Sequence, residues 1–540
     1  MKRELAAMSG QRFDLLIIGG GIVGTGIARD AALRGLKTAL VEKEDFGYGT
    51  TSRSTRLIHG GLRYLELFDF KLVREAMKER EVLLRIAPHL VKSLPFITPV
   101  YHGDRYGPAM VRLGLTLYDL LSWGSSLPGH RGLSAAELLR LEPGLRSEGL
   151  RGGALYYDGQ ASYPERLCVE NALSAADYGA QLANHATVMR FLVQDRRVSG
   201  ALVCDELSGR TQEIRAKWTV NATGPWVDRL NGPLGLPQLV RKTKGIHLVM
   251  PRFTRHAIVM LARRDGRLFF AIPWQEYSLI GTTDTDFEND LDRLSAHDDE
   301  VQYLLEETRR FFPKLRPDIL YTIAGVRSLI RLEGVAPSRV PRGHRIIEHS
   351  KDGLVGLISL VGGKLTTYRE LAREVVNRVA GKLGRAGRCR TRELPLYGGA
   401  ITDLPSYIGQ AQTSYERLGL AAEQIESLIR TYGTKFEEVL ELVEREPKLG
   451  EQLCPQRPEI RAQVVYGLER EMVCSSADFL LHRSGLGLAA GQGLDYLAQV
   501  SKLIGERLDW DAGQAEQDQA DYRARLELTG GQAFHSKVRR

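Results

Sequence analysis

The chain has few cysteines, and they are poorly placed for binding a metal. Its 540 residues include five cysteines, an odd number, namely Cys168, Cys204, Cys389, Cys454 and Cys474. Their wide separation argues against a zinc site and against a cysteine-ligated iron–sulfur cluster. Unpaired thiols are typical of a reducing compartment. We therefore predict a cytoplasmic protein without a metal.

Long hydrophobic runs are also missing. No apolar run approaches the ~20 residues that cross a bilayer, so any membrane contact is expected to be peripheral. The first residues do not have the apolar core and cleavage site of a signal peptide, so none is expected. Residues 110–123, MVRLGLTLYDLLSW, are apolar enough to be considered as a surface anchor. We favour their interpretation as a core segment.

Basic residues are in excess but are not clustered. The formal net charge is +8, and no run of lysine and arginine reaches five residues. On a chain of this length such a charge is weak evidence for nucleic acid, and we predict no nucleic-acid partner. A basic face that meets anionic lipid or a phosphorylated substrate is compatible with the same charge.

Residues 13–42 contain a nucleotide-binding pattern. A short apolar run precedes Gly19, Gly21 and Gly24, and a helical pattern follows them. This G-x-G-x-x-G spacing allows a tight turn, a close approach of pyrophosphate to the main chain, and close packing of helix on strand. Glu42 ends the second predicted strand, where its carboxylate can accept hydrogen bonds from an adenosine ribose. An acid there disfavours NADP, but the turn alone does not choose between NAD and FAD.

Three later segments are rich in the residues that line cofactor sites. Residues 49–66 combine glycines and hydroxyl side chains with Arg53, Arg56, His59, Arg63 and Tyr64, residues 220–228 read VNATGPWVD, and residues 361–370 read VGGKLTTYRE. In the last segment, Lys364 and a helix N-terminus would both place positive potential near a flavin ring, which becomes anionic on reduction.

The remaining pattern indicates a mixed α/β region followed by helices. We expect helices at 66–87 and 166–180, and an antiparallel meander over 185–222 that returns to the main sheet. A further helix is predicted from Thr366 to Val379, with a capping box formed by Thr367 and Glu370. Helical periodicity dominates from about residue 400 onward.

Taken in order, these segments resemble the FAD-dependent, respiratory glycerol-3-phosphate dehydrogenases. The motifs that carry the resemblance include DLLIIGGGIVGTGIARDAALRGL (14–36), TSRSTRLIHGGLRYLE (51–66), NATGPWVD (221–228), GVRSL (325–329) and GGKLTTYR (362–369). They cover about two-thirds of the chain, and DFLLHRSGLG (478–487) matches the closing motif of the family more loosely.

The resemblance implies an α/β fold in three parts. These are an FAD-binding Rossmann-like domain of the glutathione-reductase/D-amino-acid-oxidase type, an antiparallel-sheet substrate domain and a C-terminal helical cap domain. Residues 1–395 would form the oxidoreductase region and residues 396–540 the cap. The FAD-binding segments are expected at about 13–95, 166–240 and 350–385, and the substrate-domain segments at about 96–165 and 241–349.

The resemblance also assigns site residues. FAD is expected to contact Gly19, Gly21, Gly24, Glu42, Thr51, Ser52, Ser54, His59, Gly60, Gly224, Gly363, Lys364, Leu365 and Thr366. Glycerol 3-phosphate is expected to meet Arg63, Tyr64, Arg327 and Arg342, because arginine forks suit a dianionic phosphate. His247 is the first candidate for the catalytic base and His59 the second, with Lys364 orienting the 2-hydroxyl or stabilising the reduced flavin.

The electron acceptor implied by the resemblance is membrane quinone. The protein would then be a homodimer attached peripherally to the inner face of the cytoplasmic membrane. Three alternatives remain open at this point: a glycerol-3-phosphate oxidase that reduces oxygen, a flavoenzyme of the same fold that oxidises amines or hydroxyacids, and a non-enzymatic nucleotide-binding sensor.

Overall fold

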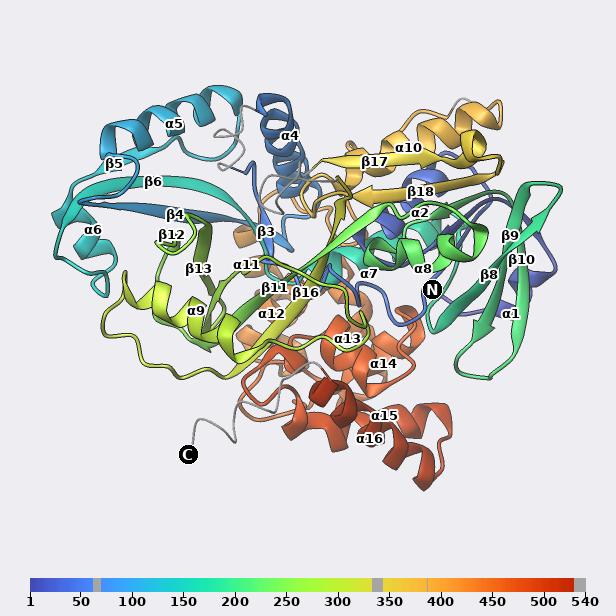
Figure 1. Cartoon of the computed structure of the whole chain (residues 1–540). Helices are drawn as coiled ribbons and strands as arrows, with labels where there is room; N and C mark the ends of the chain where they lie inside the picture. Colours follow the sequence, from blue (N-terminus) through green and yellow to red (C-terminus); the bar gives the residue numbers. More distant parts are fainter. Residues whose placement is uncertain (62–68, 333–342, 386, 529–540) are drawn as a thin grey trace.

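Figure 1 shows the computed structural model, which describes residues 1–61, 69–332, 343–385 and 387–528. Two β-sheets form the larger part of the molecule, and a helical region that begins near residue 404 packs against them (Figure 1). Three residues predicted for the substrate pocket, Arg63, Tyr64 and Arg342, lie outside the described residues.

The first sheet carries the glycine turn. Its strand order is β17-β18-β10-β1-β2-β7, and β9 joins β8 to β10. The bounds are β1 Arg12–Ile18, β2 Thr38–Val41, β7 Gln181–Ala183, β8 Ala186–Gln194, β9 Arg197–Asp205, β10 Thr211–Asn221, β17 His344–Glu348 and β18 Leu357–Gly362. Because β1 is parallel to β2 and β10, and β10 to β18, their carboxyl ends meet at one edge. The predicted meander that returns to this sheet is confirmed.

Small side chains allow helices to approach this sheet closely. Helix α2, Ile22–Leu33, packs against α7, Pro164–Asp177, and α10, Tyr368–Lys382. A Cβ atom at Gly26 would lie 2.8 Å from the Tyr368 ring. Apolar side chains of these three helices fill the core on one face of the sheet. On the other side lie α1, Leu5–Ser9, and α8, Val227–Asn231, which contact β10 and β18 respectively.

The second sheet is mainly antiparallel. Its order is β15-β11-β14-β13-β12-β4-β6-β3, with β16 paired to β11 and β5 to β6. The strands are β3 Leu57–Ile58, β4 Val91–Tyr101, β5 Arg131–Leu133, β6 Leu150–Ala161, β11 Val240–Pro251, β12 Ala257–Leu261, β13 Leu268–Trp274, β14 Tyr277–Gly281, β15 Thr285–Asp286 and β16 Tyr321–Ile330. The helices of this region are α4 Phe70–Ile86, α5 Pro108–Leu121, α6 Ala135–Leu141 and α9 Asp298–Arg309.

Helix α5 corrects one expectation. Residues 110–123 were expected in the core, yet α5 buries chiefly Leu115 and Tyr118, while Met110, Leu113 and other large apolar side chains are exposed. The expectation is wrong because apolar content alone does not say which face of a helix meets the protein. α5 packs chiefly against β6, and it also contacts α4 and β5.

The predicted capping box of α10 is also wrong. The helix begins at Tyr368, and Glu370 accepts hydrogen bonds from the side chains of Arg369 at 3.2 Å and Arg373 at 2.9 Å. Thr367 occupies the N-cap position, but within the described structure its side chain does not cap the helix. The carboxylate of Glu370, which the pattern assigned to the backbone N–H of Thr367, forms ion pairs with arginine side chains instead.

The C-terminal region is helical, as predicted. Its helices are α11 Leu404–Ser414, α12 Ala422–Tyr432, α13 Phe436–Arg445, α14 Arg461–Arg470, α15 Leu494–Leu508 and α16 Ala512–Leu528. Arg483 and His482, in a π-helical turn, bind Asp45 of the first sheet region at 2.6 and 2.9 Å, and Arg166 binds Glu471 at 2.8 Å. These buried pairs fix the helical region against the edge that carries β2, because separating one partner would leave an uncompensated buried charge.

Over the described ranges, no helix combines the length and the apolar character needed to cross a bilayer.

Candidate functional site

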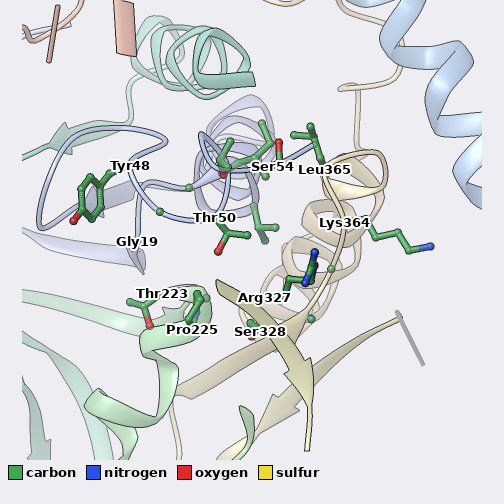
Figure 2. Close-up of a pocket in the computed structure, with 18 of the residues that line it drawn as sticks. Gly19, Tyr48, Thr50, Ser54, Thr223, Pro225, Arg327, Ser328, Lys364 and Leu365 are labelled. Atoms are coloured by element: carbon green, nitrogen blue, oxygen red, sulfur yellow. The ribbon is translucent and has the colours of Figure 1, made fainter. Parts of the chain in front are cut away.

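A cavity of about 1100 Å³ runs from the glycine turn to the second sheet. At one end it is lined by Glu42, after β2, and by Thr187 of β8. At the other end it is lined by Arg327 of β16 and by the turn between β18 and α10. Figure 2 shows part of this wall, with Gly19 and Tyr48 on one side of the view and Lys364 on the other. The cavity therefore joins segments that are more than 300 residues apart in sequence.

The glycine end of the cavity is built from the main chain. Gly19 has φ of 109°, and a Cβ there would lie 2.7 Å from the carbonyl oxygen of Ala222. A Cβ at Gly24 would lie 1.9 Å from the carbonyl oxygen of Gly19. Helix α2 begins after Gly21 and directs its N-terminal N–H groups toward the turn. This arrangement favours an anionic pyrophosphate close to the backbone.

Glu42 supports the glycine turn. Its carboxylate accepts hydrogen bonds from the backbone N–H of Gly20 at 2.6 Å and of Glu44 at 3.0 Å. Burial raises the pKa of Glu42, and these two N–H groups act in the opposite direction. The side chain lines the cavity, so its predicted contact with an adenosine ribose stays a prediction.

Eleven of the residues predicted to contact FAD line the cavity. They are Gly19, Gly21, Glu42, Thr51, Ser54, His59, Gly224, Gly363, Lys364, Leu365 and Thr366.

Three others, Gly24, Ser52 and Gly60, lie off the wall that the described residues form. Gly24 packs helix on strand, and the Ser52 hydroxyl donates to the carbonyl of Tyr48 at 2.9 Å. Gly60 leaves room for Tyr118, whose hydroxyl would be 2.5 Å from a Cβ there. In the described structure these three residues shape the site, and their predicted direct contact with the cofactor stays a prediction.

The two candidate histidines are placed differently. His59 lines the cavity, and burial lowers its pKa, an effect that Asp158 opposes and Lys364 reinforces. His247, on β11, is 2% exposed and lies behind Thr55 rather than on the cavity wall, as far as the described residues define it. Its Nε2 atom is 3.0 Å from the Thr55 hydroxyl, and burial together with Arg327 and Arg56 lowers its pKa to about 3. Both imidazoles are therefore neutral near pH 7, but His247 reaches the cavity only through Thr55.

Arg327 is held in place by groups from the turn after β14. Its guanidinium donates to the Thr282 hydroxyl at 2.9 Å, to the Thr283 carbonyl at 3.2 Å and to the Asp284 carboxylate at 3.1 Å. A fixed guanidinium at the cavity wall suits a planar or tetrahedral anion. In Figure 2 the Lys364 side chain extends away from Arg327, so the two cations serve different parts of the wall.

Several cavity residues were missed by the sequence prediction. Thr55, Trp226 and Asp284 stand inside motifs that carry the resemblance but were not singled out, whereas Asp158 had no signal in the sequence. Asp158 reaches the site because β6 pairs with β3, and it accepts hydrogen bonds from Arg80 at 2.7 Å and from the Tyr118 hydroxyl at 2.6 Å. Only strand pairing reveals such a position.

Among the residues that the structure describes, two groups of side chains have atoms close enough together to hold a metal ion, His185, Cys474 and Asp478 in one and Asp45, Asp478 and His482 in the other. Arg483 binds both oxygens of Asp45, at 2.6 and 2.9 Å, and His185 lies 3.0 Å from Asp478. We interpret these groups as an ion-pair network between the first sheet and the helical region.

Comparison with known proteins gives a consistent result. The FAD dependent oxidoreductase family matches residues 14–376, and the family described as the C-terminal domain of alpha-glycerophosphate oxidase matches residues 389–515. A glycerol-3-phosphate dehydrogenase of Synechocystis sp. is 40% identical, over 97% of this chain and 98% of its own length. The aerobic glycerol-3-phosphate dehydrogenase of Bacillus subtilis is 34% identical, over 94% of each chain.

A solved structure agrees with these relatives. The glycerol-3-phosphate dehydrogenase of Bacillus halodurans, determined in complex with FAD, superposes with a TM-score of 0.81 at 30% identity and covers 97% of this chain and 96% of that one. The predicted fold class and the family resemblance are thereby confirmed. The chain belongs to the family of FAD-dependent glycerol-3-phosphate dehydrogenases.

Proposed function

We propose that the protein binds FAD and oxidises sn-glycerol 3-phosphate to dihydroxyacetone phosphate, and that its electrons pass to membrane quinone. The observation that carries the proposal is the continuous cavity of about 1100 Å³, which joins a backbone-lined anion site to a wall carrying Arg327 and His59. A nucleotide-binding sensor would need the anion site but not the wall that carries Arg327 and His59.

The residues present suit FAD. Two close approaches, Gly24 to Gly19 and Gly19 to Ala222, leave no room for a Cβ atom and keep the main chain open to a pyrophosphate. Gly363 has φ of 101°, so the turn before α10 can direct its backbone toward the other end of the cavity. Glu42, Thr51 and the turn from Gly363 to Thr366 would hold the cofactor. When bound, FAD supplies the acceptor for the hydride from C2 of the substrate.

The substrate phosphate is assigned to Arg327. The anchoring of this guanidinium by Asp284 and Thr282 fixes its direction before the substrate binds, which lowers the ordering cost of binding. Arg63, Tyr64 and Arg342 remain predicted partners of the phosphate. Oxidation also releases the proton of the 2-hydroxyl, which needs a neutral base at the cavity wall.

His59 is the candidate base with direct access to the cavity, and its lowered pKa keeps it unprotonated at neutral pH. His247 can accept the same proton only if the Thr55 hydroxyl relays it across the 3.0 Å contact. We therefore place His59 before His247, which reverses the order that the sequence suggested. Lys364 is assigned to the same end of the cavity as His59, where its positive charge would stabilise the reduced flavin.

The acceptor, location and assembly follow the family expectation. We propose membrane quinone as the acceptor, a homodimer as the assembly, and peripheral attachment to the inner face of the cytoplasmic membrane. The competing function is glycerol-3-phosphate oxidase, which would share the first half of the reaction and pass electrons to oxygen. Peroxide formation measured against reduction of a quinone analogue separates the two.

An anaerobic titration tests the substrate and the cofactor together. The purified yellow protein should lose its flavin absorbance when glycerol 3-phosphate is added. Arg327→Ala should bind FAD normally and raise KM for glycerol 3-phosphate by about 10- to 100-fold, since a charged hydrogen-bonding partner is lost. The control is Arg241→Ala on β11, whose side chain pairs with Asp286 and lies off the described cavity wall.

A colourless protein, or one that holds FAD but is not bleached by the substrate, would contradict the proposed function. Unchanged kinetic constants in Arg327→Ala would remove that residue from the phosphate site.

A further inference from the structure

The backbone at His59 leaves the second sheet immediately after β3. This strand, Leu57–Ile58, is only two residues long and pairs with Gln160 and Gly159 of β6. A Cβ atom at Gly159 would lie 2.7 Å from the carbonyl oxygen of Ile58, so the two strands approach closely because that position is glycine. His59 stands one residue beyond this short strand, and its position depends on further contacts.

Two side chains hold the backbone on either side of the His59 imidazole. The His59 N–H donates to the hydroxyl of Thr366, in the turn before α10, at 3.1 Å. The Gly60 N–H donates to the carboxylate of Asp158, on β6, at 3.3 Å. His59, Asp158 and Thr366 all line the cavity. The candidate base is therefore carried by a segment that two distant elements fix in place.

Asp158 is itself held by buried donors. Its side chain is 2% exposed and accepts hydrogen bonds from Arg80 of α4 at 2.7 Å and from the Tyr118 hydroxyl of α5 at 2.6 Å. The Arg80 guanidinium is equally buried and also donates to the Ser125 hydroxyl at 2.9 Å. Charges that are removed from water act on their neighbours through a low effective dielectric. Asp158 therefore has a fixed direction and a stronger electric field than a surface carboxylate.

The charges that act on His59 have opposite signs. Among the described residues they are Asp158 on β6, Lys364 in the turn after β18 and Arg80 on α4. Burial lowers the pKa of His59, the negative charge of Asp158 opposes this effect, and the two cations reinforce it. Asp158 is thus the group that favours the imidazolium, which is the form that His59 takes after it accepts a proton.

We propose that Asp158 is a positioning residue for the reaction, which orients His59 through the Gly60 N–H and stabilises the imidazolium that forms on His59. The proposal rests on the proposed function in that His59 is its base. During oxidation the O–H bond of the 2-hydroxyl breaks and an N–H bond forms on the imidazole, while the hydride leaves C2 for the flavin. Asp158 gains no proton in this step, so its negative charge is present throughout.

Asp158→Asn tests the charge, because the amide keeps the size of the side chain. Without the carboxylate the pKa of His59 should fall further, which makes the imidazole a weaker base. The anaerobic rate of flavin reduction by glycerol 3-phosphate should drop by about tenfold. Since the reaction needs neutral His59, the decline of this rate in acid should begin at a lower pH than in the wild type. Rapid-mixing absorbance over a series of pH values measures both effects.

A double variant keeps the test decisive if Asp158→Asn folds poorly. The single change leaves the buried Arg80 guanidinium with one carboxylate fewer, which is costly. Asp158→Asn combined with Arg80→Gln removes both charges and should restore the Tm toward that of the wild type. Asp158 affects the pKa of His59 more than Arg80 does, so the shift of the pH profile should keep its direction and become smaller.

Glu471→Gln is the matched control. Its carboxylate is fully buried and binds Arg166 at 2.8 Å, and the residue lies off the described cavity wall. The substitution should lower the Tm, because it also breaks a buried ion pair. The pH at which flavin reduction declines should stay at the wild-type value, which a carboxylate with a merely structural role would also give at position 158.

A readout without substrate separates this proposal from the function. In FAD-loaded protein that contains 13C-labelled histidine, the NMR signal missing from His59→Asn belongs to His59, and it should titrate at a lower pH in both Asp158 variants. A signal that does not move to lower pH, or a rate that falls equally at every pH, would overturn the proposal. So would a wild-type rate in His59→Asn. If the signal shifts as expected but glycerol 3-phosphate does not reduce the wild-type flavin, the function alone is overturned.

Discussion

The two ends of the cavity are built by different means. At the glycine end, Gly19, Gly24 and the N-terminus of α2 shape the wall with backbone atoms that are close together in sequence. At the opposite end, His59 and Arg327 come from segments more than 250 residues apart and act through their side chains. The first end recognises a group common to many nucleotides, while the second determines which substrate reacts. This difference explains why the first end can be found from one short motif, whereas the second had to be assembled from several separate motifs.

Substitutions at the two ends of the cavity should also have different consequences. A side chain added at the glycine end collides with backbone, which cannot move without disturbing β1 and α2. A side chain removed at the opposite end leaves the fold in place and changes the chemistry. Substitutions at Gly24, His59 and His247 test this contrast, in order of expected effect.

Gly24→Ala should have the largest effect. The added Cβ would lie 1.9 Å from the carbonyl oxygen of Gly19, so β1 and α2 must separate. We expect a loss of about 3 kcal/mol or more in the free energy of unfolding, together with loss of bound FAD. Denaturant unfolding and flavin absorbance measure both quantities. The control is Gly381→Ala near the end of α10, where the structure leaves open space around the new Cβ and stability should rise slightly. Normal flavin content in Gly24→Ala would show that the close packing there is not required.

His59→Asn should keep both fold and flavin but slow the chemistry. Loss of the base is expected to reduce the rate of flavin reduction by about 100-fold or more. His247→Asn and Thr55→Val should each have smaller effects, because His247 reaches the cavity only through the Thr55 hydroxyl. Rapid-mixing measurements under anaerobic conditions give these rates.

The double variant provides the internal control for this relay. If His247 acts through Thr55, combining His247→Asn with Thr55→Val should cost no more than either change alone. A wild-type rate in His59→Asn, with a large loss in His247→Asn, would restore the order that the sequence suggested.

Acid should destabilise the protein partly through His247. Its pKa in the folded protein is lowered to about 3, from an ordinary value of 6.5, by burial and by Arg327 and Arg56. The unfolded chain therefore binds a proton that the folded protein excludes, so the stability present above about pH 6.5 declines as the pH falls toward 3. His247→Gln should make this decline shallower in pH-dependent melts. His102→Gln, at an exposed position, is the control, and an equal slope in both variants would contradict the assignment.

Much of the fold could be predicted from the sequence, because its signals are local. The apolar strand before Gly19, the meander over 185–222 and the helical periodicity after residue 400 each depend on neighbours in the chain. Local patterns failed where other side chains competed for the same group. Glu370 matched a capping box but binds Arg369 and Arg373 instead, and the boundary placed at residue 395 stays a prediction.

In the candidate site, too, residues in local motifs could be predicted, and residues placed by tertiary contacts could not. Most residues predicted to contact FAD line the cavity, because motif spacing encodes turns whose backbone faces the ligand. Asp158 carried no signal, since the pairing of β6 with β3 brings it to the wall, and Asp284 stood in a motif of the resemblance but had no role assigned to it. The ranking of His59 and His247 also depended on how far each imidazole lies from the cavity, which the sequence alone does not show.

By itself, the sequence determined the nucleotide-binding turn, the class of cofactor and the family, because glycine spacing and motif order constrain the local backbone. Only the tertiary structure decided which side chains share the cavity, that His247 lies behind Thr55, and that α5 presents its leucines to the outside. The physical reason is that burial and orientation depend on what packs against an element, and those partners are distant in the chain.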